Sequence, residues 1–180
     1  MLPFLVAAVL VAAIAAVVDW RTGNIPDRLT LPTLLGAPVA YLARGIVTHA
    51  GSEAAVSEAG WSLAGALGCA AIPLLLYRQS AIGFGDVKLF AALGALLQPM
   101  IGFEAQTYGF IAAALIAPAR LAYEGKLLRT IKNTLFLVAN PFMPKDKRRQ
   151  VDQEMMSWFR LGPAIFVGTV LAALLHWRGP

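Results

Sequence analysis

The chain has 180 residues, of which 58% are hydrophobic and only 14% charged, and its formal net charge is +5. Soluble domains carry about 25% charged residues, and a soluble all-helical chain of this length would need several helices that are hydrophobic on every face. The composition therefore excludes an ordinary soluble domain and indicates several membrane-spanning helices.

Six apolar segments predict the fold class, which is an all-α polytopic membrane protein with six transmembrane helices. They cover residues 2–18, 29–47, 59–77, 89–103, 105–123 and 161–177. Each is close to the length that a hydrocarbon core of about 30 Å requires at about 1.5 Å per residue. We expect residues 1–180 to form a single membrane-embedded domain.

The first segment allows two interpretations. Ala13-Ile14-Ala15 fits the cleavage pattern of a secretory signal peptide, but Met1–Phe4 contains no lysine or arginine. A signal peptide begins with a basic region. We therefore expect this segment to be a retained first helix.

Lysine and arginine are unevenly distributed, and this predicts the orientation. Six crossings divide the loops into two sets, and 13 of the 15 basic residues fall in loops 19–28, 78–88 and 120–160. Cytoplasmic loops carry the excess of basic residues. We therefore expect these loops in the cytoplasm and both termini outside. Since orientation explains the positive charge, no nucleic-acid partner is expected.

The long loop 120–160 contains two further features. Its first part places apolar side chains on one helical face, which predicts a helix lying in the interface. These side chains are Leu127, Leu128, Ile131, Leu135 and Val138. The basic run 145–149 is either a topology anchor or a contact for a partner or lipid headgroup.

Two aspartates lie at the same side of the predicted helices. Asp19 ends the first segment, which runs from outside to inside, and Asp86 precedes the fourth, which runs from inside to outside. Both are therefore expected at the cytoplasmic interface and at similar depth. An ionisable group at a membrane edge is costly, so it is a functional hypothesis by default.

Two carboxylates close together cannot both ionise cheaply, so a pair shares one proton. The ionised carboxylate can take a proton from water, and the protonated one can polarise a carbonyl group. Asp19 and Asp86 are thus predicted to be catalytic in an aspartic peptidase that uses no metal and no cofactor. Taken singly, Asp19 could instead pair with Arg21 or Arg28, and Asp86 could cap a helix.

The residues around the aspartates predict a substrate-binding region. Gly83 and Gly85 leave room for an extended peptide, and Ile25-Pro26 sets the turn that returns the chain to the membrane. Asp27 and Lys88 are included in this region. Lys88 could tune Asp86, contact the substrate or anchor the fourth helix.

The stretch Gly83–Leu89 resembles the GxGD signature of the aspartic prepilin peptidases. Asp19 with Ile25-Pro26 resembles that family's other signature, an aspartate six residues before Ile-Pro-Asn, and Asp27 stands where the family often has Asn. The six-helix layout and the late stretch Leu161–Ile165 also resemble the family.

The resemblance implies that Asp19 and Asp86 are both catalytic. It also implies cleavage of the short charged leader of type IV pilin-like precursors, at the cytoplasmic face of a bacterial inner membrane. The expected partners are a prepilin and the lipid bilayer, while the particular precursor and the oligomeric state stay open. Archaeal preflagellin peptidases share these signatures.

The compact form of the chain resembles the members that serve tight-adherence (Flp) pili. Large bifunctional members carry an insert with paired Cys-x-x-Cys motifs, and Cys69 alone could not build such a zinc site. We therefore expect no N-methyltransferase activity.

Two rival functions and a metal site are less favoured. A presenilin-like protease would have a tyrosine before the first aspartate, where Val18 stands. A small transporter could use Asp19 and Asp86 as proton or cation sites, but such sites usually lie at mid-bilayer. His49, Glu53 and His176 are too few and too scattered to favour a metal site.

Overall fold

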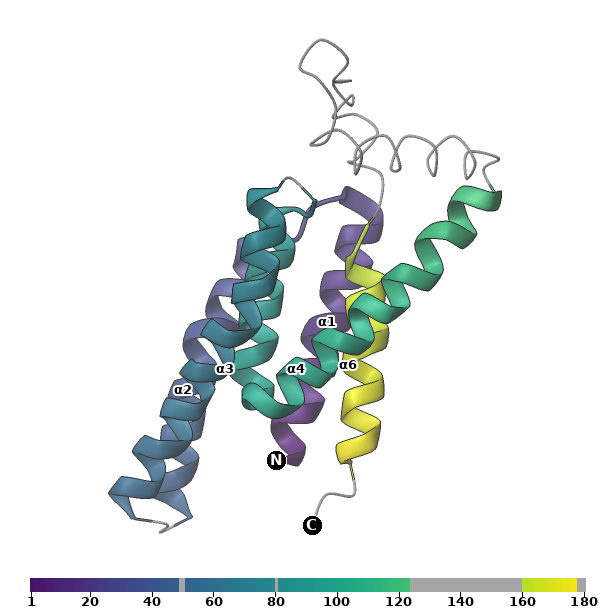
Figure 1. Cartoon of the computed structure of the whole chain (residues 1–180). Coiled ribbons are helices and arrows are strands. Elements are labelled where there is room, and N and C mark those ends of the chain that lie inside the picture. The colour runs from purple at the N-terminus through teal and green to yellow at the C-terminus, as the bar shows by residue number, and fades with distance from the viewer. Residues whose placement is uncertain (49–50, 80, 124–159, 178–180) are drawn as a thin grey trace, which may run out of the picture. The chain divides into compact units, whose positions relative to one another are not determined.

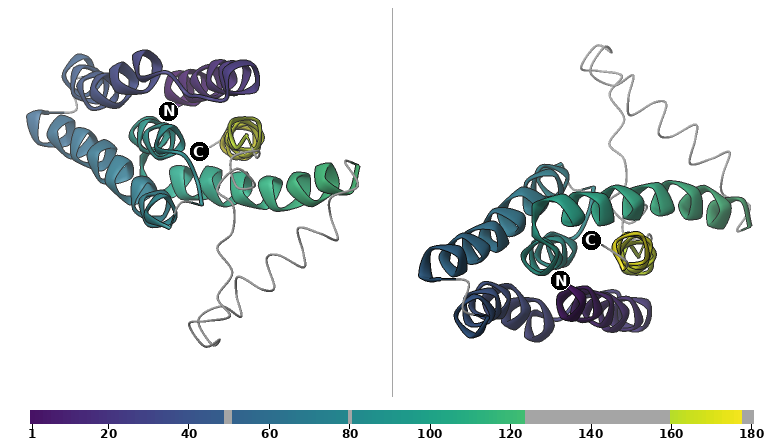
Figure 2. Two further views of the ribbon diagram at one scale, coloured as in Figure 1. Left: turned by 90° about the horizontal axis from the view of Figure 1, so that it is seen from above. Right: turned by 90° about the horizontal axis from the view of Figure 1, so that it is seen from below.

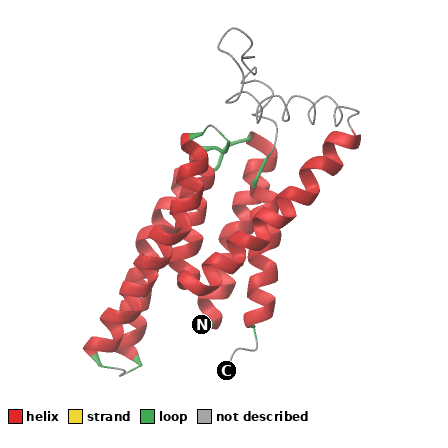
Figure 3. Cartoon of the chain, viewed as in Figure 1, coloured by secondary structure: helices red, strands yellow, loops and turns green. Residues whose placement is uncertain are grey.

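The computed structural model describes residues 1–48, 51–79, 81–123 and 160–177, and within them the regular structure is helical, without strands (Figures 1 and 3). The helices are α1 Leu2–Thr22, α2 Asp27–Val47, α3 Ser52–Arg78, α4 Phe84–Tyr123 and α6 Gly162–His176. The chain divides into two compact units, Met1–Ala112 with Arg160–Pro180, and Ala113–Phe159. The contacts below belong to the first unit. The all-helical prediction is confirmed for the described residues.

In the part of the chain that the structure describes, four helical segments are long and apolar enough to cross a membrane, judged by length and composition. They are Leu2–Thr22, Asp27–Val47, Ser52–Arg78 and Phe84–Ala119. The last predicted segment is the shorter apolar helix α6, which has 15 residues. The structure thus supports a protein built from membrane-type helices. The predicted interfacial helix and the basic run 145–149 lie outside the described residues.

The predicted boundary between the fourth and fifth segments, at Glu104, is wrong. The helix α4 continues through Glu104 and is interrupted at Gln98, whose backbone has φ 61° and ψ 174°. Pro99 explains the position, because a residue before proline is disfavoured in helical conformation and proline has no N–H for the ladder. Within the first unit α4 therefore has two arms, 84–97 and 99–112, that run in different directions (Figure 1).

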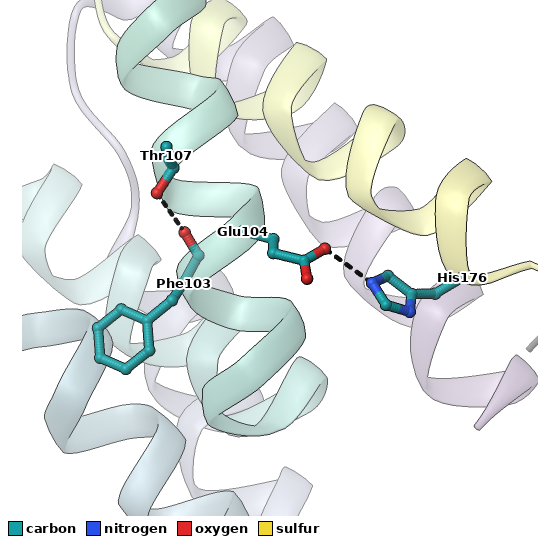
Figure 4. A network of polar contacts seen from close by, with 4 residues as sticks. All are labelled: Phe103, Glu104, Thr107 and His176. Carbon is teal, nitrogen blue, oxygen red and sulfur yellow. Dashed lines mark hydrogen bonds and ion pairs between the residues drawn. The ribbon is translucent and has the colours of Figure 1, made fainter.

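The charge of the Glu104 side chain is compensated by a partner on another helix, and no loop is found at this residue. Its Oε2 lies 2.7 Å from Nε2 of His176, near the end of α6 (Figure 4). One turn along, the Thr107 hydroxyl donates to the carbonyl of Phe103 at 2.8 Å, which satisfies it inside the helix. A single charge in an apolar run is therefore a poor sign of a helix end when a second helix supplies its partner.

The first arm of α4 is the centre of the unit. Every residue from 89 to 97 is buried, and end-on views show this arm between the other helices (Figure 2). The missing N–H of Pro99 would leave the carbonyl of Ala95 without its helical donor, and the hydroxyl of Ser62 donates to that carbonyl at 2.7 Å. The hydroxyl of Tyr41 donates to the next carbonyl, that of Leu96, also at 2.7 Å. Side chains of α3 and α2 thus supply the hydrogen bonds around the break.

Pairs of glycines set the closest helix crossings. A Cβ on Gly65 of α3 would collide with the backbone of Gly94 in the first arm of α4. A Cβ on Gly168 of α6 would collide with the backbone of Gly109 in the second arm. Small residues let helices approach this closely in membranes. Both arms of α4 are therefore held by backbone-to-backbone contact.

Two alanine substitutions in α3 test this packing. We expect Gly65→Ala to lower the free energy of unfolding by about 1–3 kcal/mol, because backbone atoms of Gly94 and Gln98 occupy the space of the new methyl group. Gly60→Ala is the matched control, since nothing lies within 4 Å of that position. Thermal unfolding in detergent, followed by tryptophan fluorescence, compares the two. Equal effects would contradict the close crossing.

Candidate active site

Asp19 lies in the last turn of α1 and its side chain is nearly enclosed, since the residue is 5% exposed. Gly23 ends the helix in a left-handed conformation, with φ 70°, and its N–H donates to the carbonyl of Asp19 at 2.8 Å. Oδ2 of Asp19 accepts a hydrogen bond from the N–H of Gly162 at 2.9 Å. Gly162 is the first residue of α6, where N–H groups have no partner within the helix and favour a negative charge.

Gly162 also has to be glycine for Asp19 to fit. A Cβ at this position would lie 2.8 Å from both Cβ and Oδ2 of Asp19. Reasoning from sequence left Gly162 out of the site. The signal was a glycine directly before proline, at the start of the last apolar segment.

Asp86 lies in the first turn of α4 and is half-buried. Its Oδ2 accepts a hydrogen bond from the N–H of Gly83 at 3.1 Å, and its own N–H donates to the carbonyl of Gly83 at 3.2 Å. This reciprocal pair resembles a capping box, in which an acidic side chain in the first turn reaches back to the residue that begins the helix. The alternative that Asp86 caps a helix thus explains the hydrogen bond that one of its carboxylate oxygens, Oδ2, accepts.

The structure brings the two carboxylates into one neighbourhood. Ile25, six residues after Asp19, lies against Gly85, the residue before Asp86, so the segments that follow Asp19 and precede Asp86 pack on one another. In the part of the chain that the structure describes, no ion pair joins Asp19 to Arg21 or Arg28. A simple surface ion pair therefore does not explain the position of Asp19.

The loop after α1 packs directly on the start of α4. Ile25 is 4% exposed, and a Cβ on Gly85 would lie 3.2 Å from Cβ of Ile25. Pro26 follows in an extended conformation, with φ −73° and ψ 136°, and α2 then begins at Asp27. The space that Gly85 leaves is therefore taken by Ile25, whereas a Cβ on Gly83 would meet only Oδ2 of Asp86, at 3.4 Å.

Lys88 is directed to a carboxylate other than Asp86. Its Nζ lies 2.6 Å from Oδ1 of Asp27 and 4.8 Å from the centre of the Phe84 ring. The site residues named in the sequence analysis lie around the end of α1 and the starts of α2 and α4. These residues are Asp19, Ile25, Pro26, Asp27, Gly83, Gly85, Asp86 and Lys88.

Of the three residues weighed for a metal site, the structure describes Glu53 and His176, which lie on different helices. Among the described residues, no three histidine, cysteine or acidic side chains come together as ligands. Glu53 is exposed in the first turn of α3, and His176 contacts Glu104. His49 lies outside the described residues.

A bundle of membrane-type helices with two neighbouring carboxylates at one end indicates a membrane-embedded protein with a candidate acid–base site. Comparison with known proteins identifies its family. The profile of the type IV leader peptidase family matches residues 5–118, which include both aspartates. The chain belongs to this family. It is similar to the leader peptidase HopD of Salmonella typhimurium (strain LT2), with 36% identity over 99 residues. That alignment covers 52% of this chain and 59% of HopD, so the chain matches little more than half of this relative. No solved structure matches.

Gly162→Ala tests the contact between α6 and Asp19. The added methyl group displaces the buried carboxylate from its N–H donor, so we expect the free energy of unfolding to fall by about 1–3 kcal/mol. Gly83→Ala is the control, because its methyl group meets Asp86 at an ordinary contact distance, and we expect a change below about 0.5 kcal/mol. Thermal unfolding in detergent measures both. A tolerated Gly162→Ala would contradict the described contact.

Proposed function

We propose that the chain is an integral-membrane aspartic endopeptidase. It removes the short leader of type IV pilin-like precursors, of the Flp or Tad type, and has no N-methyltransferase activity. One observation carries the proposal: two neighbouring carboxylates, Asp19 and Asp86, each receive a hydrogen bond from a glycine N–H through Oδ2. Membership of the type IV leader peptidase family supports this class of reaction.

The two aspartates divide the proton transfers between them. In the described part of the chain the hydrogen-bond donors reach Oδ2 of each aspartate, so we assign the chemistry to the Oδ1 atoms. The ionised carboxylate removes a proton from water, whose oxygen then bonds to the scissile carbonyl carbon. The protonated carboxyl group donates its proton to the carbonyl oxygen. When the tetrahedral intermediate collapses, one of its hydroxyl groups returns its proton to the ionised carboxylate and the C=O bond forms again. The C–N bond breaks at the same time, and the leaving nitrogen takes its proton from the carboxyl group that water had protonated, so the pair ends with one shared proton.

Fixed donors are useful in such a mechanism because they hold the carboxylates before substrate arrives. A catalytic group that is misplaced by about 1 Å can lower the rate about 100-fold. The N–H of Gly162 and the N–H of Gly83 belong to the backbone, so they cannot rotate away as side chains do. We infer that they orient Asp19 and Asp86 respectively.

We propose that the substrate approaches along the segment that carries Asp86. Gly83 is exposed and leaves room for an extended peptide, while Ile25, Pro26 and Gly85 form the wall beside it. Asp27 and Lys88 flank this approach. The apolar helix of the precursor docks between enzyme helices in the bilayer, and its leader stays at the cytoplasmic surface.

The proposed topology has six crossings, formed by α1, α2, α3, the two arms of α4 and α6, in one domain over residues 1–180. Loops 19–28, 78–88 and 120–160 face the cytoplasm of a bacterial inner membrane, and both termini face outside. The start of α1 and the end of α6 lie at one end of the unit, and the end of α1 and the start of α4 lie at the other (Figure 1). Since Asp19 is in the last turn of α1 and Asp86 in the first turn of α4, this supports the arrangement.

Asparagine variants of the two aspartates test the function. The protein reconstituted in lipid with a candidate Flp-type precursor should release the leader, and Asp19→Asn and Asp86→Asn should each lower the rate at least about 100-fold. Glu53→Gln should keep the wild-type rate, because Glu53 lies in the first turn of α3, at the end of that helix far from the aspartates. If either aspartate variant cleaves at a near-normal rate, the two-aspartate mechanism is wrong. If the wild type cleaves no precursor, the transporter alternative gains support.

Single cysteines test the orientation. Cys69 is 1% exposed, so it should react little with a membrane-impermeant maleimide. Asn24→Cys lies in the exposed loop after α1, and Gly51→Cys lies at an exposed position directly before α3. In inside-out vesicles we expect labelling at position 24 and not at 51, and in spheroplasts the reverse. The opposite pattern would contradict the orientation.

A further inference from the structure

Asp27 and Lys88 form the one described ion pair that joins the segment after Asp19 to the segment of Asp86. Nζ of Lys88 lies 2.6 Å from Oδ1 of Asp27. The side chain of Lys88 is 22% exposed and that of Asp27 is 56% exposed. Asp27 is the first residue of α2, and Lys88 is in the second turn of α4, two positions after Asp86. The pair therefore connects the starts of two helices.

The ammonium group of Lys88 is also held from a second side. It lies 4.8 Å from the centre of the Phe84 ring, and this ring lies 5.1 Å from the ring of Tyr77 in α3. A cation over an aromatic face is attracted by about 0.5–1 kcal/mol at exposed sites. Contacts thus run from α2 through Lys88 and Phe84 to α3, and they engage the ammonium group of Lys88 without the substrate.

This connection matters because Asp19 and Asp86 lie on different helices. The chain between Asp19 and Asp27 is short, and its middle is fixed by the contact of Ile25 with Gly85. Ile25 limits how closely the loop approaches α4, and the ion pair opposes movement of the loop away from α4. Together they leave little freedom in the spacing between the two carboxylates.

We propose that Asp27 and Lys88 are positioning residues whose ion pair sets the spacing between Asp19 and Asp86, and that neither residue binds the substrate. The inference rests on the proposed function, because its purpose is to hold the catalytic pair. A positioning role and a substrate-binding role for these two residues predict different kinetic effects of substitution. Loss of spacing lowers kcat, whereas loss of a substrate contact raises KM.

A double-mutant cycle tests the pair. Asp27→Ala and Lys88→Met are made singly and together, and leader removal is measured for kcat and KM. We expect each single variant to lower kcat about threefold to tenfold, the double variant to be no worse than the poorer single one, and KM to stay within about twofold. Lys88→Arg should restore most of the rate. Arg28→Gln, which removes a neighbouring exposed charge, is the matched control and should keep the wild-type kcat.

Either of two kinetic results would overturn the inference. If the losses of the single variants multiply in the double variant, then Asp27 and Lys88 act separately. If Lys88→Met raises KM while Asp27→Ala changes nothing, then Lys88 contacts the substrate.

A second measurement does not depend on peptidase activity. Nitroxide labels on Trp20→Cys and Ala81→Cys, both exposed, report the spacing of the two segments by electron paramagnetic resonance. We expect a broader distance distribution with Asp27→Ala and with Lys88→Met, and an unchanged one with Arg28→Gln. An unchanged distribution in all variants would overturn the inference. If the wild type cleaves no precursor, the proposed function fails, and the labels still decide whether the ion pair sets the spacing.

Discussion

The buried carboxylate of Asp19 is the constraint on which the arrangement of this site depends. A carboxylate that is 5% exposed beside apolar helices requires a compensating donor, because burying an unpaired charge is costly. The N–H of Gly162 supplies that donor, and only a residue without a side chain fits there. The last helix must therefore return to the end of the first one, so that residues 143 positions apart in sequence form one wall of the site.

The position of Asp86 depends on a different feature, which is the burial of the helix that carries it. Residues 89–97 are buried on all sides, and the arm ends at Gln98 in a conformation that ordinary side chains rarely adopt. Hydroxyl groups of Ser62 and Tyr41 satisfy the carbonyls beside this break. The first turn of α4 thus rests on a rigid central helix. Such a rigid support suits the catalytic role proposed for Asp86, because the position of a catalytic group must vary little.

Sequence patterns predicted most of this architecture because membrane-spanning helices are strongly constrained by length and hydropathy. They also brought Asp19 and Asp86 to one end, since alternating helix directions follow from counting segments. They misjudged the end of the fourth segment, where the charge of Glu104 was more conspicuous than the conformational effect of Pro99. They missed Gly162, because its contribution is a backbone N–H and a missing Cβ. Neither the pairing of Lys88 with Asp27 nor that of His176 with Glu104 could be predicted from the spacing of residues in the sequence. Both pairings depend on how each helix is oriented about its own axis.

The central claim is that Asp19 and Asp86 behave as one proton-sharing pair. Infrared spectroscopy of the reconstituted protein tests it directly, because a protonated carboxyl group gives a carbonyl band that an ionised one lacks. The account predicts one such band at neutral pH that Asp19→Asn and Asp86→Asn each remove, since like charges close together cannot both ionise cheaply. A spectrum without that band, or a band that survives both substitutions, would contradict the account.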